Sequence, residues 1–231
     1  MDYELLLVKK LDKVAVVTLN RPEKRNALST ALRNEIDACL AALEADDEVS
    51  VVVIAASGPA FCAGFDTSEL ADRDPEHMRA VSESSDRYHG RLASFPKPLV
   101  AAVNGPAMGG GFDLAVLCDV RVASESAVFA HPEIKFGAPS LFGPLREIVG
   151  GGLARELCLT GRRVDAQEAL RFGLVSRVVE EEDMLLEVAL ATARTIAEAP
   201  AGTLKLIKRQ IIQTYGWSME DGGGALFQNL T

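Results

Sequence analysis

The stretch from Leu99 to Asp113 reads LVAAVNGPAMGGGFD, an apolar run that ends in three consecutive glycines and a carboxylate. A continuously apolar run is typical of a strand that is covered on both faces. Glycines carry no side chain, so a bound molecule can approach their backbone N–H groups closely, and the apolar residues from Phe112 onward indicate that a helix begins here. The segment therefore predicts a buried strand, a binding loop and a helix N-terminus.

The residues after the glycines narrow the kind of anion that these N–H groups could bind. A phosphate-binding loop has a Lys and a Ser or Thr after its glycines, whereas this segment has Phe112 and Asp113. Asp113 would repel a permanent phosphate but suits a negative charge that develops only during a reaction, such as that on the enolate oxygen of a thioester. The alternative is a tight turn in which Asp113 merely complements the helix dipole.

The same order of strand, glycine-bearing loop and helix occurs earlier in the chain. Val49 to Ala56 is continuously apolar, PAFCAGFD follows from Pro59 to Asp66, and a polar, helix-compatible region extends from Glu69 to Ala93. Ligands collect in loops at the carboxyl ends of parallel strands. Both loops are therefore candidates for one binding site.

The rest of the chain predicts a mixed α/β fold. Asp165 with Glu168 forms a capping box for a helix that Gly173 closes. Further strands are expected at Val14–Leu19, Val120–Ala123, Ala127–Ala130 and Leu174–Val179, and further helices at Ser29–Glu44, Glu182–Ala199 and Thr203–Tyr215. We expect a loop rich in glycine and proline from His131 to Gly143, and a loosely ordered tail, SMEDGGGALFQNLT, at the end.

Length and composition limit the classes of function. With 231 residues, 48% of them hydrophobic, the chain can bury a sizeable core, and we predict one core domain over residues 1–200 followed by a helix and short tail over 201–231. The net charge of −9 argues against a general binder of nucleic acid or of an anionic membrane. No apolar run reaches the length of a membrane span, and the N-terminus resembles neither a secretory signal nor a transit peptide, so we expect the cytoplasm.

The cysteines and histidines give no sign of a metal site. The four cysteines are widely separated, which indicates reduced, mostly buried thiols. His77 and His89 lie in the polar helical region without ligand spacing, so no metal is predicted.

Four segments together resemble the crotonase, or enoyl-CoA hydratase/isomerase, superfamily. They are RPEKRNAL (Arg21–Leu28), AFCAGFD (Ala60–Asp66), KPLVAAVNGPAMGGGFDLAVLCDVRVAS (Lys97–Ser124) and FAHPEIKFG (Phe129–Gly137), followed by LTGRRVDAQEALRFGLVSRVV (Leu159–Val179). The resemblance implies a spiral of ββα units with a helical C-terminal region. It also implies an acyl-CoA thioester substrate, with coenzyme A as part of the substrate and no permanently bound cofactor, and a homotrimer or homohexamer.

The resemblance also implies roles for individual residues. The thioester oxygen would lie between the backbone N–H groups of Phe65 and Gly110, an oxyanion hole. Lys24 and Arg25 would meet the adenosine and phosphate end of coenzyme A, while the adenine and pantetheine path would be lined by Ala63, Asp66 and Leu70.

Two acids are expected to decide the reaction. In hydratases of the family one Glu follows the glycine loop and a second follows the proline of the later loop, and together they hold the water that is added. Glu133 matches the second position, and Pro132 helps to fix its direction. Asp113 stands at the first, which shortens the carboxylate's reach by about 1.5 Å. His131 could tune the pKa of the presumed base or donate to substrate, and otherwise acts as a hydrogen-bonded loop residue.

Three functions follow from this pattern. The leading hypothesis is an enoyl-CoA hydratase in which Asp113 and Glu133 activate water and relay its proton. The alternatives are a double-bond isomerase that uses Glu133 alone and a catalytically silent acyl-CoA binding subunit. The chain also ends sooner than family members commonly do, so either the helices that cover the acyl pocket are absent or the sequence is shorter than the natural one.

Overall fold

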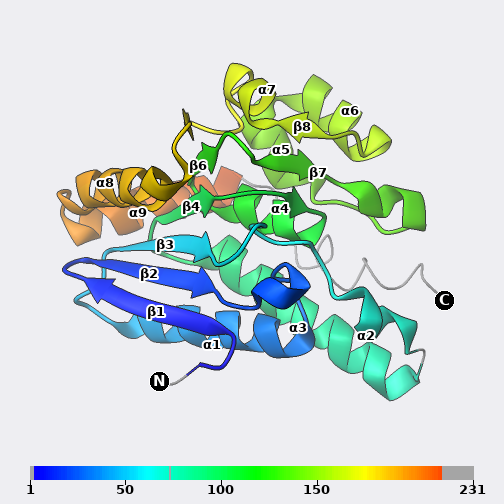
Figure 1. Cartoon of the computed structure of the whole chain (residues 1–231). Coiled ribbons are helices and arrows are strands. Elements are labelled where there is room, and N and C mark those ends of the chain that lie inside the picture. Colours follow the sequence, from blue (N-terminus) through cyan, green and yellow to red (C-terminus); the bar gives the residue numbers. More distant parts are fainter. Residues whose placement is uncertain (1–2, 73, 215–231) are drawn as a thin grey trace.

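A six-stranded sheet forms the centre of the computed structural model, which describes residues 3–72 and 74–214 (Figure 1). The strand order is β1-β2-β3-β4-β6-β9, and only β1 and β2 pair antiparallel. These strands are Leu6–Leu11, Val14–Leu19, Val51–Ala56, Leu99–Val103, Val120–Ser124 and Arg177–Val179. A smaller sheet of order β5-β7-β8 contains Ala107–Met108, Val128–Ala130 and Val164–Asp165.

The central strands β3 and β4 are buried on both faces. Successive residues of β3 alternate between two hydrophobic clusters, with Val52 and Ile54 in one and Val51 and Val53 in the other. Helix α8 (Leu185–Ala197) packs on the second face. Because both faces contact apolar side chains, these strands are apolar throughout, as the sequence predicted.

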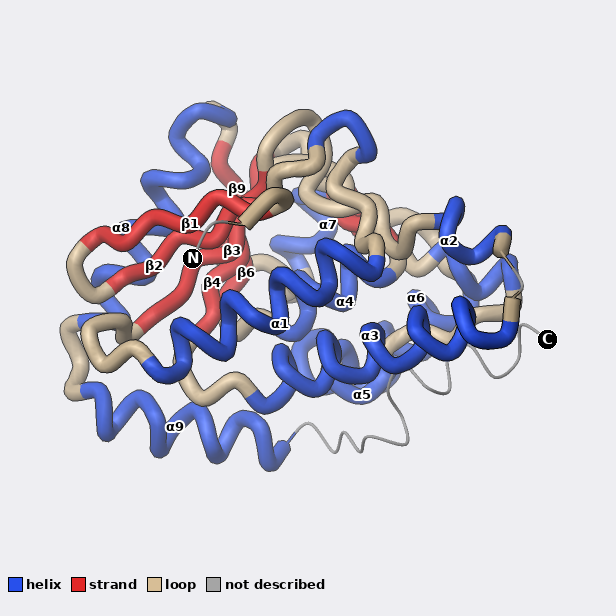
Figure 2. The backbone as a smooth tube through the Cα atoms, turned by 90° about the horizontal axis from the view of Figure 1, so that it is seen from below, coloured by secondary structure: helices blue, strands red, loops and turns tan. Residues whose placement is uncertain are grey.

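The other face of the sheet is covered by α1 (Thr30–Ala45) and by α3 (Pro75–Ser94), which run side by side (Figure 2). Helix α1 begins where its sequence predicts, because the Ser29 hydroxyl accepts the Leu32 N–H at 3.2 Å and so caps the first turn. The remaining helices are α4 (Gly110–Leu117), α5 (Phe142–Val149), α6 (Gly151–Thr160), α7 (Ala166–Arg171) and α9 (Ala201–Thr214), with 3₁₀ helices η1 (Pro22–Lys24), η2 (Pro132–Phe136) and η3 (Glu182–Met184).

The helix-compatible region predicted from Glu69 to Ala93 is divided in two. A short helix, α2 (Thr67–Ala71), precedes α3. The Asp74 carboxylate accepts two backbone N–H bonds from the first turn of α3, at 3.1 and 3.0 Å, and Pro75 occupies the first position. This cap starts a new helix, which hydrophobic periodicity alone did not separate from the first.

Three other predictions of secondary structure need correction. The strand expected at Leu174–Val179 is confined to Arg177–Val179, because the N–H groups of Leu174 and Val175 bond back to Ala169 at the end of α7. The loop expected from His131 to Gly143 contains η2 and the start of α5. Strands β1, β5 and β8 were not predicted. Most residues of β1 are exposed, without an alternation of buried and exposed positions, and β5 and β8 are only two residues long.

Helix α9 is attached to the core by a buried ion pair. The Lys208 ammonium contacts both carboxylate oxygens of Asp119, at 2.6 and 2.7 Å, and one of these oxygens also accepts the Leu99 N–H at the start of β4. The predicted tail lies outside the described residues, so its order is not tested. Within residues 3–72 and 74–214, no helix combines the length and apolar character that crossing a membrane requires.

Candidate active site

A pocket of about 460 Å³ lies where the loops after β3 and β4 meet η2. Its size is that of a site for a small molecule. The loop after β3 and α2 supply Ala63, Gly64, Phe65, Thr67 and Leu70; the glycine loop and α4 supply Gly109, Gly110 and Asp113; η2 and the segment after it supply Pro132, Glu133, Phe136, Ala138 and Pro139.

The loops after β3 and β4 pack so closely that only glycine fits at two positions. The Met108 N–H donates to the Cys62 carbonyl at 2.9 Å, and the Cys62 N–H donates to Pro106 at 3.1 Å. A Cβ on Gly111 would lie 2.2 Å from that Cys62 oxygen, and one on Gly64, which has a φ of +91°, would lie 2.7 Å from the Met108 carbonyl. The glycines therefore permit the close approach of the two loops.

Hydrogen bonds of the preceding carbonyls fix the directions of the backbone N–H groups of two residues that line the pocket, Phe65 and Gly110. The Gly64 carbonyl accepts the Leu28 N–H at 2.8 Å, so the Phe65 N–H of the same trans peptide points the opposite way. The Gly109 carbonyl likewise accepts the Asp113 N–H at 3.0 Å inside α4, which directs the Gly110 N–H out of the helix. Gly110 is the first residue of α4, where an N–H has no acceptor within the helix.

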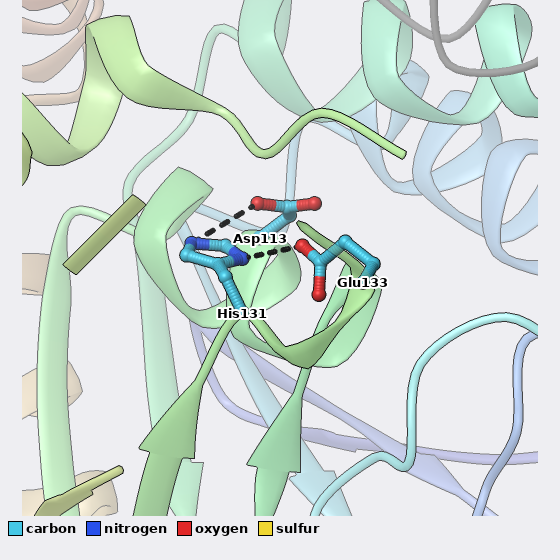
Figure 3. Close-up of side chains that lie close together, drawn as sticks. All are labelled: Asp113, His131 and Glu133. Atoms are coloured by element: carbon cyan, nitrogen blue, oxygen red, sulfur yellow. Dashed lines mark hydrogen bonds and ion pairs between the residues drawn. The ribbon is translucent and has the colours of Figure 1, made fainter. Parts of the chain in front are cut away.

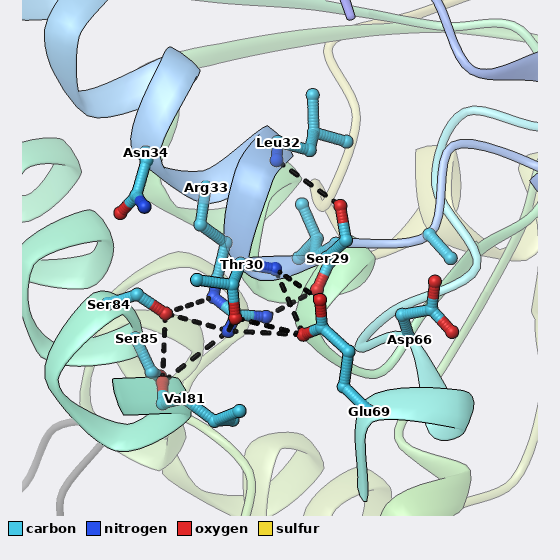
Figure 4. A network of polar contacts seen from close by, with 12 residues as sticks. Ser29, Thr30, Leu32, Arg33, Asn34, Asp66, Glu69, Val81, Ser84 and Ser85 are labelled. Atoms are coloured by element: carbon cyan, nitrogen blue, oxygen red, sulfur yellow. Dashed lines mark hydrogen bonds and ion pairs between the residues drawn. The ribbon is translucent and has the colours of Figure 1, made fainter. Parts of the chain in front are cut away.

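A buried guanidinium supports the Phe65 loop from behind, in a group that we call the Arg33 network: Arg33, Thr30, Glu69 and Ser84 (Figure 4). Arg33 is fully buried, and its guanidinium lies 4.8 Å from the centre of the Phe65 ring. It bonds to the Ser84 and Thr30 hydroxyls and the Leu28 carbonyl, with Glu69 at 3.6 Å. Burial lowers the pKa of Arg33 to about 10, so it remains a cation near neutral pH.

Two carboxylates and an imidazole, which we call the acid cluster, lie close together, and both carboxyl residues line the pocket (Figure 3). The ring of His131 stands between Asp113 from α4 and Glu133 from η2. Its Nδ1 lies 2.7 Å from Glu133 Oε1, and its Nε2 lies 3.8 Å from Asp113 Oδ1. Glu133 Oε2 lies against Gly109, where a Cβ would come within 3.0 Å of it. Both carboxylates thus border the glycine loop.

Burial changes the proton affinity of this cluster. Loss of solvent raises the pKa of Asp113 to about 7; the charge of Glu133 adds to this effect and that of His131 opposes it. Burial lowers the pKa of His131, but the charge of Asp113 and the hydrogen bond with Glu133 outweigh it and hold that pKa above its ordinary value. A carboxyl that titrates near neutrality can both take and give a proton.

The acid cluster also has spacing that would suit a metal ion, since one ligand atom from each residue lies within 4.8 Å of the others. However, His131 Nδ1 is already engaged by a Glu133 oxygen. This hydrogen bond links His131 to Glu133, and the absence of a metal at the cluster stays a prediction.

Sequence comparison connects this geometry to known proteins. The model of the enoyl-CoA hydratase/isomerase family matches residues 9–221 of the chain. The chain belongs to the enoyl-CoA hydratase/isomerase family. A probable enoyl-CoA hydratase of Mycobacterium bovis is 40% identical over 225 residues, which cover 96% of this chain and 86% of that protein. The predicted crotonase superfamily is thereby confirmed.

Solved structures confirm the crotonase-like fold. The crystal structure of an enoyl-CoA hydratase from Bacillus anthracis has a TM-score of 0.87 and 32% identity, covering 94% of this chain and 86% of that one. A monofunctional enoyl-CoA isomerase from M. smegmatis has a TM-score of 0.78 and 33% identity, covering 94% and 97%. The same fold therefore carries both names among the neighbours of this chain.

In this member of the family, most of the predicted site residues meet at the pocket. Phe65, Gly110, Asp113 and Glu133 all line it, and so do Ala63 and Leu70, which the sequence assigned to the coenzyme A path.

The other predicted binding residues lie outside the pocket lining. Lys24 and Arg25 are exposed on and just after η1, and the Arg25 carbonyl accepts the Ala63 N–H at 3.0 Å. Asp66 is buried and forms an ion pair with Arg21 at 2.7 Å while it caps α2. Through these contacts Asp66 stabilises the segment between β3 and α2.

Several pocket and support residues were not singled out from the sequence. Thr67, Phe136, Ala138 and Pro139 line the pocket, and Arg33 supports it. Phe136 is 77% exposed, and a large apolar residue inside a loop rich in glycine and proline is a signal that could have been used. Arg33 gave no such signal, because two of its partners, Ser84 and Glu69, come from distant parts of the chain.

Proposed function

We propose that the protein is an enoyl-CoA hydratase, which adds water across the 2,3 double bond of an enoyl-CoA thioester. The observation that carries this proposal is the presence of two carboxylates, Asp113 and Glu133, on one pocket beside the glycine loop. The names of the curated relatives support it, among them 2,3-dehydroadipyl-CoA hydratase of Escherichia coli at 39% identity. Two carboxylates suit a reaction that must both activate water and deliver a proton to carbon.

The thioester oxygen would accept hydrogen bonds from the N–H groups of Phe65 and Gly110. As the water oxygen bonds to C3, the π electrons of the double bond move toward the thioester, and negative charge develops on its oxygen. An N–H already directed at this charge needs no reorganisation, and each such donor is worth about 3 kcal/mol of activation free energy. In each of these two peptides the carbonyl, of Gly64 or Gly109, is bonded within the fold and the N–H points the opposite way, which supports this role.

Asp113 and Glu133 would hold the water and manage its protons. One carboxylate accepts a proton from water as the hydroxyl bonds to C3, and a carboxyl returns a proton to C2 of the enolate, so the cluster ends with as many protons as it began. Asp113, whose pKa burial raises to about 7, is suited to such exchange near neutral pH. The rigid position of Asp113 in the first turn of α4, beside the pocket, supports a role despite its short side chain.

The coenzyme A part of the substrate would follow the edge formed by Ala63 and Leu70. Lys24 and Arg25 would meet its phosphates, since both are exposed cations and the Arg25 backbone is bonded to Ala63. Asp66 would act through its ion pair with Arg21 and through α2, the helix that it caps. Coenzyme A would thus arrive and leave as part of the substrate and product, and we propose no permanent cofactor.

The family resemblance further supports a homotrimer or homohexamer in the cytoplasm. Exposed apolar side chains such as Leu159, which is 73% exposed, suit an interface between copies of the chain. Light scattering coupled to size-exclusion chromatography measures the mass of the assembly. A mass equal to that of one chain contradicts the proposed oligomer.

The decisive experiment incubates the protein with short and medium trans-2-enoyl-CoA thioesters. We expect loss of the conjugated absorbance and a product heavier by one water. An isomerase would instead convert 3-enoyl-CoA without a change of mass, and a silent binding subunit would bind the thioesters in calorimetry without turnover. Either of those results on the full panel overturns the proposal.

A further inference from the structure

His131 lies behind the two carboxylates rather than in the pocket. It is fully buried, its ring stacks on Phe112 with 4.5 Å between centroids, and Phe112 in turn contacts Phe129 of β7 at 5.4 Å. It sits at the junction of β7 and η2, with Pro132 next. Two carboxyl residues that line the pocket therefore flank one buried imidazole that is not part of the pocket lining.

The two ring nitrogens face the two acids, which limits the protonation state. A neutral imidazole has one N–H. If Nδ1 donates to Glu133, then Nε2 presents a lone pair toward Asp113 Oδ1, 3.8 Å away, and two electron-rich atoms face each other. A proton on Nε2 or on Asp113 removes that repulsion.

The polar atoms that remain in this cluster support a shared proton. Among the described residues, three atoms here are buried without a hydrogen-bond partner: Asp113 Oδ1, His131 Nε2 and Glu133 Oε2. Buried polar atoms are normally paired. The first two face each other, and the third is the oxygen that lies beside Gly109 of the glycine loop.

We propose that His131 is a positioning residue, present as an imidazolium that donates one N–H to Glu133 and directs the other at Asp113. It thereby fixes Glu133 so that Oε2 remains available beside the glycine loop, and it holds two carboxylates close together by balancing one of their charges. The inference rests on the proposed hydratase roles of Asp113 and Glu133. His131 itself keeps its protons and does not touch substrate.

No other charged group competes for this role among the described groups that act on the cluster. Cys62 after β3, Tyr88 of α3 and Cys158 of α6 interact electrostatically with its carboxylates, and burial raises the pKa of each, so all three are neutral near neutral pH. The elevated pKa of His131, which arises despite burial, agrees with its assignment as a cation.

Three substitutions separate the functions of the ring. His131→Asn places an amide nitrogen near the position of Nδ1, His131→Gln places one near Nε2, and His131→Phe preserves only the stacking on Phe112. We expect kcat to fall about 100-fold in His131→Phe and about 10-fold in His131→Asn, with KM nearly unchanged, because misplacing a reacting group by about 1 Å costs up to about 100-fold.

The pH profile distinguishes positioning by charge from mere packing. The charge of His131 lowers the pKa of Asp113, so its removal moves the acid limb of the kcat profile to higher pH in all three variants. A purely structural histidine would lower kcat without moving this limb. An acid limb that stays in place in folded His131→Asn overturns the inference.

NMR titration of histidine-labelled protein tests the charge without turnover, with His131 assigned by its loss in His131→Asn. We expect His131 to titrate above the ordinary value of 6.5, while His89, equally buried, titrates at about 4 and serves as the internal control. Asp113→Asn should lower the His131 midpoint, and if the His131 variants do not fold, this selective response identifies the His131 signal among the three histidines.

The outcomes separate this inference from the proposed function. A His131 midpoint at or below 6.5 overturns the inference even if enoyl-CoA is hydrated. A raised midpoint that falls in Asp113→Asn supports the charge coupling even if no thioester is hydrated, in which case the proposed function fails alone.

Discussion

The two loops that meet at the pocket are supported by buried polar groups of opposite character. Behind Phe65, the Arg33 network presents a fixed cation to hydroxyl and carbonyl oxygens, with Glu69 at its edge. Beside the glycine loop, the acid cluster contains Asp113, whose pKa burial raises to about 7. One support keeps its charge across the physiological range, and the other is able to exchange protons. From this difference we predict that substitutions in the Arg33 network change stability, whereas substitutions in the acid cluster change the proposed catalysis.

The largest expected effect that tests the contrast between the two supports is a loss of catalysis after a substitution in the acid cluster. Glu133→Gln removes a proton-accepting group while keeping size, and we expect kcat to fall by about 10²- to 10⁴-fold, the range for a lost general acid or base. The measurement is turnover of trans-2-enoyl-CoA, with thermal unfolding as the check on folding. Glu48→Gln, an exposed acid far from the pocket lining, is the matched control. Full activity in Glu133→Gln would remove Glu133 from the mechanism.

Arg33→Met should instead act on stability. The substitution keeps a long side chain but removes the donors to Ser84, Thr30 and Leu28, and the loss of a partner from a buried charged network costs about 3 kcal/mol. Urea unfolding measures this change. Arg79→Met is the control, because the Arg79–Glu83 pair is exposed and should contribute less than about 1 kcal/mol. Equal stability losses in the two variants would contradict the role given to the Arg33 network.

The pH dependence of stability should sharpen the contrast between the supports. The pKa of Asp113 is raised from 3.8 to about 7 on folding, so its contribution is fully present below about pH 4 and is lost as pH rises through about 7. Where one proton is released on unfolding, the free energy of unfolding falls by about 1.4 kcal/mol per pH unit. Asp113→Asn should reduce this slope, as measured by urea unfolding across the interval. The same slope in wild type and variant would show that Asp113 does not titrate as expected.

Metal removal should have the smallest effect. We expect dialysis against EDTA to leave enoyl-CoA turnover unchanged, because in the proposed mechanism the two carboxylates hold the water and no step needs a metal ion. A loss of turnover that zinc restores would instead make the cluster a metal site.

Local sequence was a good guide wherever local interactions decide the structure. The apolar runs predicted β3 and β4, the amphipathic pattern predicted the start of α1, and the three glycines with the apolar residues after them predicted the start of α4. The boundary between α2 and α3 was missed because periodicity continues across it, although Asp74 followed by Pro75 is a local signal for a new helix.

Side-chain partners across the chain were harder to predict. Arg33 looked like an ordinary polar residue of an amphipathic helix, yet its partners in α3 are about fifty positions away in the sequence. Asp66 was assigned to the substrate path from its motif, while the fold pairs it with Arg21. Neither contact is encoded by spacing, because helix packing and loop closure bring these residues together.

The sequence by itself determined the fold class, the family, the two glycine loops and the identity of the two acids, because each depends on residue types at short, fixed spacing. Only the tertiary structure decided that His131 stands between Asp113 and Glu133, and that a buried arginine lies behind Phe65. The physical reason is that burial and the charges nearby set the protonation of a group, and both arise only when segments far apart in the chain pack against one another.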